Sequence, residues 1–140
     1  MNVYILDTNI ADRLYRKHPN VLARLNALPP DAPVAATMIT VGEALGGWLS
    51  QCRRAPEGIV RSRAYERLRE VFDFYAGLKR VSFTPEAAAI FDQLKAQKIR
   101  VGTNDLSIAA ITLAVNGILV TRNFVDFERV PGLTLEDWTI

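Results

Sequence analysis

Short apolar runs alternate along this chain with longer segments of helical periodicity. Strands are predicted at residues 3–6, 33–38, 80–83 and 118–120, with an edge strand at 133–135. Helices are predicted at residues 8–17, 21–28, 41–54, 59–78, 86–97 and 105–116. The run Val3–Leu6 is apolar throughout, as expected of a central strand buried on both faces. The alternation predicts an α/β fold with a mainly parallel central sheet of four to five short strands flanked by helices.

The length and composition indicate one globular domain over residues 1–140. Hydrophobic residues make up 49% of the chain and charged residues 23%, which excludes intrinsic disorder. The uncharged run 106–121 is too short and too polar to span a membrane. No basic segment precedes the first apolar run, and Asp7 interrupts that run early, so we expect no secretory signal. A cytoplasmic protein without membrane association is therefore expected.

The chain has a single cysteine, Cys52, and a single histidine, His18. One cysteine excludes a disulfide framework and cysteine-based zinc or iron–sulfur sites, and one histidine excludes a site of several imidazole ligands. Any chemistry must therefore depend on carboxylates, hydroxyls, amides or basic groups.

Four acidic residues occupy positions where solvated surface charges are not expected. Asp7 directly follows the first apolar strand, Glu43 lies in a long stretch without basic residues, Asp105 opens an apolar helix, and Asp126 follows the strand 118–120 after a five-residue polar turn. Because ligands of parallel α/β sheets bind at the carboxyl ends of the strands, these positions are expected to converge there. Four gathered carboxylates repel one another unless a multivalent cation lies between them, and oxygen ligands favour Mg²⁺ or Mn²⁺.

A metal site of this kind predicts phosphodiester hydrolysis. The metal activates a water and stabilises charge on the transferring phosphoryl group. The net charge of +2 is only mildly basic. With four acids neutralised, however, the 17 basic side chains would clearly dominate the surface, which suits a polyanionic substrate.

Several short motifs, taken in order, resemble the PIN-domain ribonucleases. They are Leu6-Asp7-Thr8-Asn9, Thr40-Val41-Gly42-Glu43, Gly102-Thr103-Asn104-Asp105 and Thr121-Arg122-Asn123 with Asp126-Phe127. The ending 127–133 is similar to the VapC toxin branch in particular, and the resemblance extends over essentially the whole chain. Two departures are Asn104, where the family often has an apolar residue, and a long segment at 53–63, which bears on the choice of antitoxin and substrate.

The resemblance implies a Mg²⁺-dependent endoribonuclease, with Mn²⁺ as a possible substitute, that is the toxin of a toxin–antitoxin pair. A VapB-type antitoxin would block its active site, the toxin would form a homodimer, and transfer RNA would be the expected substrate. By motif match, the metal ligands and catalytic acids are Asp7, Glu43, Asp105 and the more variable Asp126. Residues expected to orient the acids, the substrate or the attacking water are Thr8, Asn9, Thr121 and Asn123, with Thr121 counted among the catalytic residues.

Other interpretations of these residues remain open. Asp7 and the neutral polar residues could be helix caps and turn formers. The chain could be a catalytically silent PIN-fold module that binds RNA or an antitoxin. A nuclease of the same fold acting on DNA is compatible with the metal chemistry, because the acids do not read the 2′-hydroxyl. A phosphatase with an aspartyl nucleophile is disfavoured, because Asn9 stands where a second acid is usual.

The predicted helices between residues 41 and 78 carry further signals. Gly46 and Gly47 inside a helix favour close helix packing as the first explanation and a kink beside Glu43 as the second. The aromatic residues at 65, 72, 74 and 75 are expected in the core or a dimer interface. Basic residues at 53–69 could bind phosphates. However, Glu66 and Glu70 are close enough on the same helix to pair with them, so a solvated, salt-bridged face is favoured.

Overall fold

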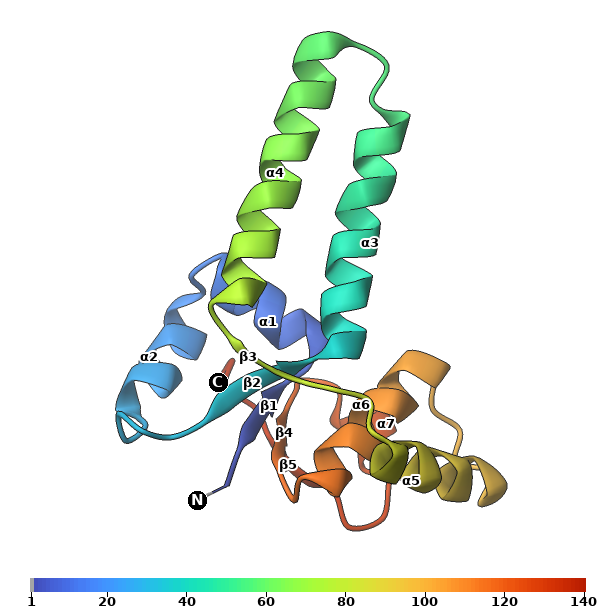
Figure 1. Ribbon diagram of the computed structural model, residues 1–140. Coiled ribbons are helices and arrows are strands. Elements are labelled where there is room, and N and C mark those ends of the chain that lie inside the picture. The colour runs from blue at the N-terminus through green and yellow to red at the C-terminus, as the bar shows by residue number, and fades with distance from the viewer. Residues whose placement is uncertain (1) are drawn as a thin grey trace.

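A computed structural model describes residues 2–140 and contains one parallel sheet of five strands (Figure 1). The strands are β1 Tyr4–Leu6, β2 Val34–Thr37, β3 Lys79–Val81, β4 Ile118–Val120 and β5 Thr134–Glu136. Their order across the sheet is β3-β2-β1-β4-β5, and every neighbouring pair is parallel. The predicted α/β fold with a parallel sheet is confirmed, and the edge strand near residue 134 is present.

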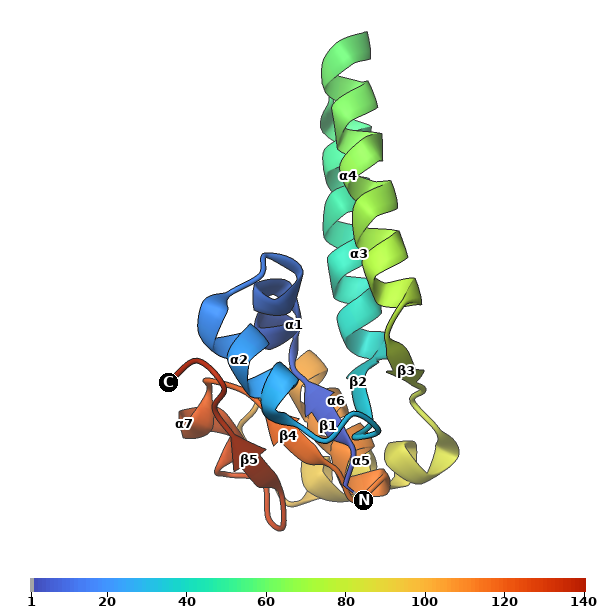
Figure 2. The ribbon, with the colours of Figure 1, turned by 90° about the vertical axis from the view of Figure 1, so that its left-hand side faces the viewer.

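Residues 2–140 also form seven helices. They are α1 Thr8–Tyr15, α2 Pro19–Ala27, α3 Met38–Arg54, α4 Gly58–Ala76, α5 Pro85–Ala96, α6 Thr103–Ala114 and α7 Phe124–Phe127. Helices α1 and α2 lie on one side of the sheet and α5 and α6 on the other, while α3 and α4 form a hairpin that projects away from the sheet (Figures 1 and 2).

Strand β1 occupies the centre of the sheet because both of its faces are apolar. Leu6 packs into a core cluster with residues of α1, α2, α3 and α4. Its neighbour Ile5 packs on the opposite face with residues of α5, α6 and α7. Both side chains are fully buried. Successive side chains of a strand point to opposite faces, so an uninterrupted apolar run is what two-sided burial requires.

The parallel register brings the carboxyl ends of the three inner strands to one edge. Leu6 is paired with Ala36 of β2 and with Val120 of β4. The residues that follow are therefore neighbours at this edge, and the backbone N–H of Asp7 donates to the carbonyl of Val120 at 3.0 Å. This edge carries the candidate site.

Two helices that carry site residues begin earlier than predicted. The helix expected from residue 41 begins at Met38, because the Thr37 hydroxyl accepts a 3.2 Å hydrogen bond from the N–H of Thr40 and caps the helix. Glu43 therefore lies more than a turn into α3 and not at its start. The helix expected from Asp105 begins at Thr103, so Asp105 lies within its first turn.

Two further predictions about these elements were wrong. The polar segment after β4 contains the short helix α7, which the sequence analysis treated as a turn; a side-chain cap by Asn123 makes it possible. Close helix packing does not explain Gly46 and Gly47, because a β-carbon at either position would meet no atom within 4 Å among the described residues.

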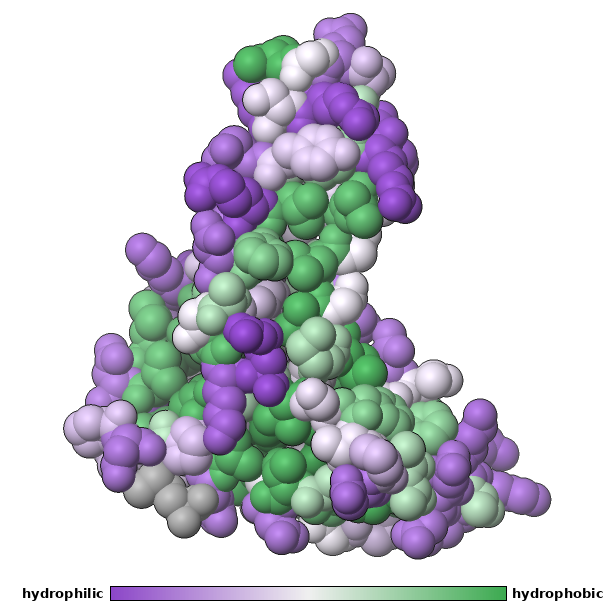
Figure 3. All heavy atoms as spheres, in the orientation of Figure 1, coloured by the Kyte–Doolittle hydropathy of each residue, from purple (hydrophilic) through white to green (hydrophobic). Residues whose placement is uncertain are grey.

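The surface of the α3–α4 hairpin is divided by polarity. Figure 3 shows apolar side chains gathered between the two helices and hydrophilic ones toward the tip. Of the four aromatic residues assigned to core or interface, Tyr75 is buried and Phe74 half-buried, whereas Tyr65 and Phe72 are exposed. The predicted salt-bridged face is present, since Arg69 pairs with Glu66 at 2.9 Å and with Asp73 at 3.0 Å. Within residues 2–140, none of the helices has the length and apolar character that crossing a membrane would need.

Candidate active site

Asp7 is the most deeply placed acid of the candidate site. It directly follows β1, and its side chain is only 6% exposed. One carboxylate oxygen, Oδ1, accepts from the N–H of Ile10 at 2.9 Å and so caps α1. The other, Oδ2, accepts from the Thr121 hydroxyl at 2.5 Å. Burial raises the pKa of Asp7, the two hydrogen bonds oppose this, and the negative charge of Asp105 adds to the rise.

Thr121 connects two parts of the site through one buried hydroxyl. It follows β4 as Asp7 follows β1, and its side chain is fully buried. Its Oγ1 donates to Asp7 and accepts from the N–H of Asn123 at 2.9 Å. The hydroxyl therefore fixes the position of the Asp7 carboxylate relative to the turn that leads to α7.

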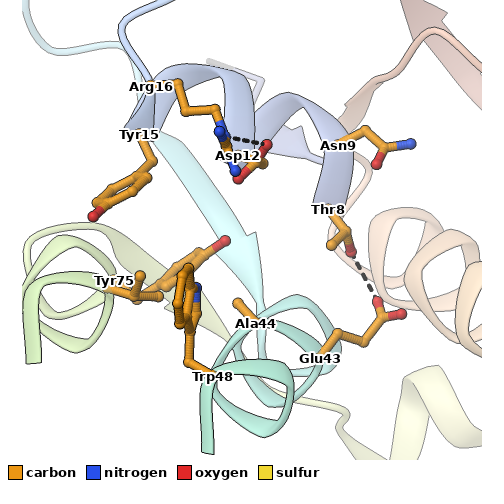
Figure 4. Close-up of a pocket in the computed structure, with 10 residues that line it drawn as sticks. Thr8, Asn9, Asp12, Tyr15, Arg16, Glu43, Ala44, Trp48 and Tyr75 are labelled. Atoms are coloured by element: carbon orange, nitrogen blue, oxygen red, sulfur yellow. Dashed lines mark hydrogen bonds and ion pairs between the residues drawn. The ribbon is translucent and has the colours of Figure 1, made fainter. Parts of the chain in front are cut away.

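Glu43 is held by the hydroxyl of Thr8 across the gap between α3 and α1. Thr8 Oγ1 donates to Glu43 Oε1 at 2.8 Å and lies 3.0 Å from the hydroxyl of Thr40. Since the single proton of Thr8 is given to Glu43, Thr40 is the donor in the second contact. Figure 4 shows Thr8 and Glu43 pointing toward each other.

Thr40 is a site residue that the sequence analysis did not assign. It is fully buried, one helical turn before Glu43 on α3. The available signal was this spacing of three, which places both side chains on one face of the helix.

Asp126 is oriented by Asn123, which also caps α7. Asn123 Nδ2 donates to Asp126 Oδ2 at 2.9 Å, and Asn123 Oδ1 accepts from the backbone N–H of Asp126 at 3.3 Å. Asp126 also lies 3.6 Å from a guanidinium nitrogen of Arg129. The capping interpretation of Asn123 is confirmed, and the same contacts fix the acid.

The negative charge of Asp105 interacts with the charges of the other three acids. Burial raises the pKa of Asp105, and the negative charges of Glu43 and Asp126 raise it further. Asp105 also contributes to the raised pKa of Asp7. The sequence-predicted acids thus share one electrostatic neighbourhood. Within residues 2–140, Asp7, Glu43 and Asp105 form no salt bridge, so no cationic side chain compensates them directly.

The types of oxygen atom at this edge suit a hard cation, but the acids do not lie close enough together to form a complete binding site. Carboxylate and hydroxyl oxygens of the types gathered here are the ligands that Mg²⁺ takes. Uncompensated like charges at one sheet edge are the arrangement that a divalent ion would stabilise. Across residues 2–140, however, no three Asp, Glu, His or Cys side chains are arranged closely enough to hold a metal ion.

A pocket adjoins Thr8 and Glu43 on the side of the α3–α4 hairpin (Figure 4). It lies between α1, α3 and α4 and has a volume of about 220 Å³. Tyr15, Trp48 and Tyr75 form its aromatic side, and Asp12 and Arg16 lie at its rim. No sequence pattern predicts this pocket, because the three aromatic residues come from three different helices and share no local spacing.

Asn9 lines this pocket, but within residues 2–140 its side chain forms no hydrogen bond with any of the acids. Its side chain is exposed and points away from the aromatic side of the pocket (Figure 4). The structure therefore brings together Thr8, Thr121 and Asn123 with their acids, and leaves Asn9 at the rim.

The fold and the acidic sheet edge correspond to a known family model. The model described as PIN domain matches residues 4–133, which include every residue of the candidate site. This match defines the class of protein to which the fold belongs.

Similar proteins place the chain more narrowly. Ribonuclease VapC2 of Haemophilus influenzae is 31% identical over 140 residues, covering 96% of this chain and 97% of that protein. The tRNA(fMet)-specific endonuclease VapC of Salmonella typhimurium is 35% identical over 86 residues, covering 58% of this chain and 65% of that protein. A solved structure of VapBC2 from Rickettsia felis, bound to a promoter DNA fragment, includes a chain with a TM-score of 0.75 and 27% identity. That match covers 97% of this chain and 98% of the solved one. The chain belongs to the VapC ribonucleases of the PIN-domain family.

Proposed function

We propose that this protein is a metal-dependent endoribonuclease that hydrolyses RNA phosphodiester bonds at the sheet edge formed by Asp7, Glu43, Asp105 and Asp126. The observation that carries the proposal is the electrostatic coupling of these acids around Asp105. Within residues 2–140, Asp7, Glu43 and Asp105 form no salt bridge, and the positive charge of Arg13 is the smallest of the influences on the pKa of Asp7. The names of the similar ribonucleases support the same reaction.

Mg²⁺, or Mn²⁺ in its place, would be held by these four acids and would supply charge stabilisation at the scissile phosphate and an activated water. The chain's own residues prepare the site. Thr121 fixes the orientation of the Asp7 carboxylate, Thr8 fixes that of Glu43, and Asn123 fixes that of Asp126. These hydrogen bonds orient each of the three carboxylates before substrate binds.

Transfer RNA is the proposed substrate, and a VapB-type antitoxin the proposed inhibitor. The tRNA proposal is supported by the Salmonella relative, whose name specifies tRNA(fMet). The antitoxin proposal is supported by the solved VapBC2 structure from Rickettsia felis. We further propose that the protein acts in the cytoplasm as a homodimer, which sedimentation equilibrium of the purified chain would test.

The decisive experiment is incubation of the purified protein with total bacterial RNA, with Mg²⁺ or with EDTA. We expect discrete fragments only with Mg²⁺, and sequencing of their ends identifies the substrate. Asp7→Asn and Asp105→Asn should each reduce cleavage by at least about 100-fold, because each removes an acid of the reaction centre. Asp92→Asn, which changes an exposed carboxylate on α5, is the matched control and should cleave normally.

A catalytically silent module that binds RNA or an antitoxin is the second candidate. It is favoured by the absence, within residues 2–140, of three acids in metal-binding geometry. RNA binding without cleavage in any lane, by a protein with native circular dichroism, would support this candidate over the ribonuclease. Cleavage that Asp7→Asn and Asp105→Asn leave intact would exclude the proposed site.

A further inference from the structure

The aromatic pocket beside Glu43 has no role in the proposed cleavage chemistry. Three ring-bearing side chains line it, one from each of three helices: Tyr15 from α1, Trp48 from α3 and Tyr75 from α4. In Figure 4, Tyr15 and Trp48 approach the pocket from opposite sides, and Thr8 and Glu43 form its other end. An aromatic surface thus adjoins one of the acids assigned to the reaction.

The two tryptophans of the chain differ in a way that sets Trp48 apart. Trp138 is 1% exposed, its indole N–H donates to Glu136 at 3.0 Å, and its ring lies 5.5 Å from that of Tyr4. Trp48 is half-buried, and within residues 2–140 its indole has neither a hydrogen-bond acceptor nor an aromatic partner. A tryptophan removed from water usually finds such partners, so the free face of Trp48 is suited to an aromatic ligand.

Tyr75 places a hydrogen-bonding group at the inner end of the pocket. Its ring is buried, and its hydroxyl points into the pocket (Figure 4). Burial, together with the charges of Asp12 and Glu43, raises the pKa of Tyr75 to about 12. No other residue among 2–140 bonds to this hydroxyl, which leaves it able to donate to a ligand.

The rim of the pocket is polar. Asp12 of α1 and Arg16, the C-cap residue of that helix, form an exposed ion pair of 2.9 Å. Tyr15 is held by a 3.2 Å hydrogen bond to Glu70 and by an edge contact with Phe74. The side chain of Tyr15 is therefore positioned before any ligand arrives, which lowers the entropic cost of binding.

The size of the pocket matches a single aromatic ring system. A dry cavity of roughly 150 Å³ accommodates benzene, so 220 Å³ has room for one nucleobase and not for two. Tyr15, Arg16 and Trp48 also line an adjoining hollow, which is completed by Lys17, Arg67 and Glu70. Of the three cationic side chains there, Arg16 pairs with Asp12 and Arg67 with Glu70, while Lys17 forms no salt bridge within residues 2–140 and could contact a phosphate.

We propose that this pocket binds one nucleobase of the RNA strand, stacked on Trp48, next to the phosphodiester held at the acidic edge. The proposal rests on the proposed ribonuclease function. Stacking tolerates every base, so the choice among bases would come from hydrogen bonds of the base edge with the Tyr75 hydroxyl and the Asp12 carboxylate. Trp48 and Tyr75 are thus assigned as specificity-determining residues.

Tryptophan fluorescence tests the pocket without any cleavage step. The full chain is titrated in EDTA with each of the four nucleoside 5′-monophosphates, up to millimolar concentration, and with ribose 5-phosphate as the control that lacks a base. We expect saturable quenching by at least one nucleotide and none by ribose 5-phosphate. Trp48→Phe should abolish the quenching, because the remaining tryptophan, Trp138, is buried away from the pocket.

Binding measured by calorimetry extends the test to variants. Trp48→Ala should weaken the binding of the quenching nucleotide about tenfold or more, because a stacking platform is lost. Tyr75→Phe removes only the hydroxyl and should weaken binding about two- to tenfold while preserving the fold. Phe72→Ala, an exposed aromatic of the same helix outside this pocket, should bind as the wild type does. Quenching that persists in Trp48→Phe, or that ribose 5-phosphate reproduces, would overturn the proposal.

Cleavage of a randomised RNA pool provides the second readout. We expect a base preference at one position beside the cut, which Trp48→Ala and Tyr75→Phe lose or alter and Phe72→Ala retains. An unchanged preference in both pocket variants, together with no nucleotide quenching, would refute the pocket assignment while leaving the ribonuclease intact. Nucleotide binding at Trp48 in a protein that cuts no RNA would instead support the pocket and reject the proposed function.

Discussion

At the scale of single residues, Asp7 combines a structural and a functional position. The same carboxylate that caps α1 accepts the Thr121 hydroxyl, so its orientation is determined from two directions. Helix capping and participation in an acidic site had been alternative interpretations of Asp7. The geometry makes them compatible, because the cap uses one oxygen and Thr121 contacts the other.

The raised pKa of Asp7 predicts how its ionisation affects stability. Below the ordinary value of 3.8 the carboxyl is protonated in both folded and unfolded chains. As the pH rises above that value, the unfolded chain releases the proton first, so stability falls until the folded pKa is passed. In EDTA, Asp7→Asn should therefore be more stable than wild type at pH 7, and the difference should shrink toward pH 4. Urea unfolding measures this; a variant that is less stable at both pH values would contradict it.

The Thr121 hydroxyl predicts a second effect at this scale. Thr121→Val keeps the shape of the side chain but leaves the Asn123 N–H without its acceptor and Asp7 without its donor. Loss of a buried, charge-assisted hydrogen bond should lower the free energy of unfolding by about 1.5–3 kcal/mol. Thr121→Ser retains the hydroxyl and should lose less. Urea unfolding at pH 7 compares the two, and equal losses would show that the methyl group matters more than the hydrogen bonds.

At the scale of elements, local capping residues decide where the site helices begin. Thr37 starts α3 three residues earlier than the apolar pattern predicts, and Asn123 creates α7 where a turn is expected. The periodicity of apolar residues indicates which face of a helix is buried. It does not indicate how many residues of the helix precede the first buried one. Helix existence was therefore predicted more accurately than helix starts.

The two glycines of α3 give a prediction about this element. At Gly46 and Gly47 an added β-carbon meets nothing within 4 Å, so alanine would improve helix propensity without a clash. Each substitution should raise the free energy of unfolding by about 0.5–1 kcal/mol, measured in urea.

Gly117 provides the opposite case as a control. A β-carbon there would lie 3.0 Å from the carbonyl oxygen of Val3 and 3.2 Å from its side chain, both in the segment that leads into β1. Gly117→Ala should destabilise the protein. A destabilising Gly46→Ala would mean that a contact of α3 had been missed.

At the scale of the whole molecule, the sheet order assembles the site. Asp7 and Thr121 are 114 positions apart, yet they are neighbours because β1 and β4 are adjacent parallel strands in register. The acids come from four segments of the chain. Bringing these like charges together lowers the free energy of unfolding, and the packing of the sheet and its helices offsets that loss.

Binding of a divalent ion should restore part of this lost stability. Mg²⁺ binding only to the folded chain would add about 2.7 kcal/mol at a concentration 100 times its Kd, a rise in Tm of roughly 10 °C. Thermal unfolding monitored by circular dichroism, with Mg²⁺ against EDTA, measures the shift. Asp105→Asn should abolish most of it, whereas the control Asp92→Asn should keep it. An equal shift in wild type and Asp105→Asn would place the ion elsewhere.

The sequence by itself determined the class of fold and the sheet edge at which the acids lie. Uninterrupted apolar runs predict parallel strands that are buried on both faces, and parallel strands bring their carboxyl ends together. The local pattern alone therefore predicts that Asp7 and Thr121 lie at the same edge of the sheet. Only the tertiary structure decided that Thr8 holds Glu43 and that Tyr15, Trp48 and Tyr75 enclose one pocket. These contacts depend on how α1, α3 and α4 cross one another. Packing angles arise from the fit of side chains far apart in sequence, which no local period encodes.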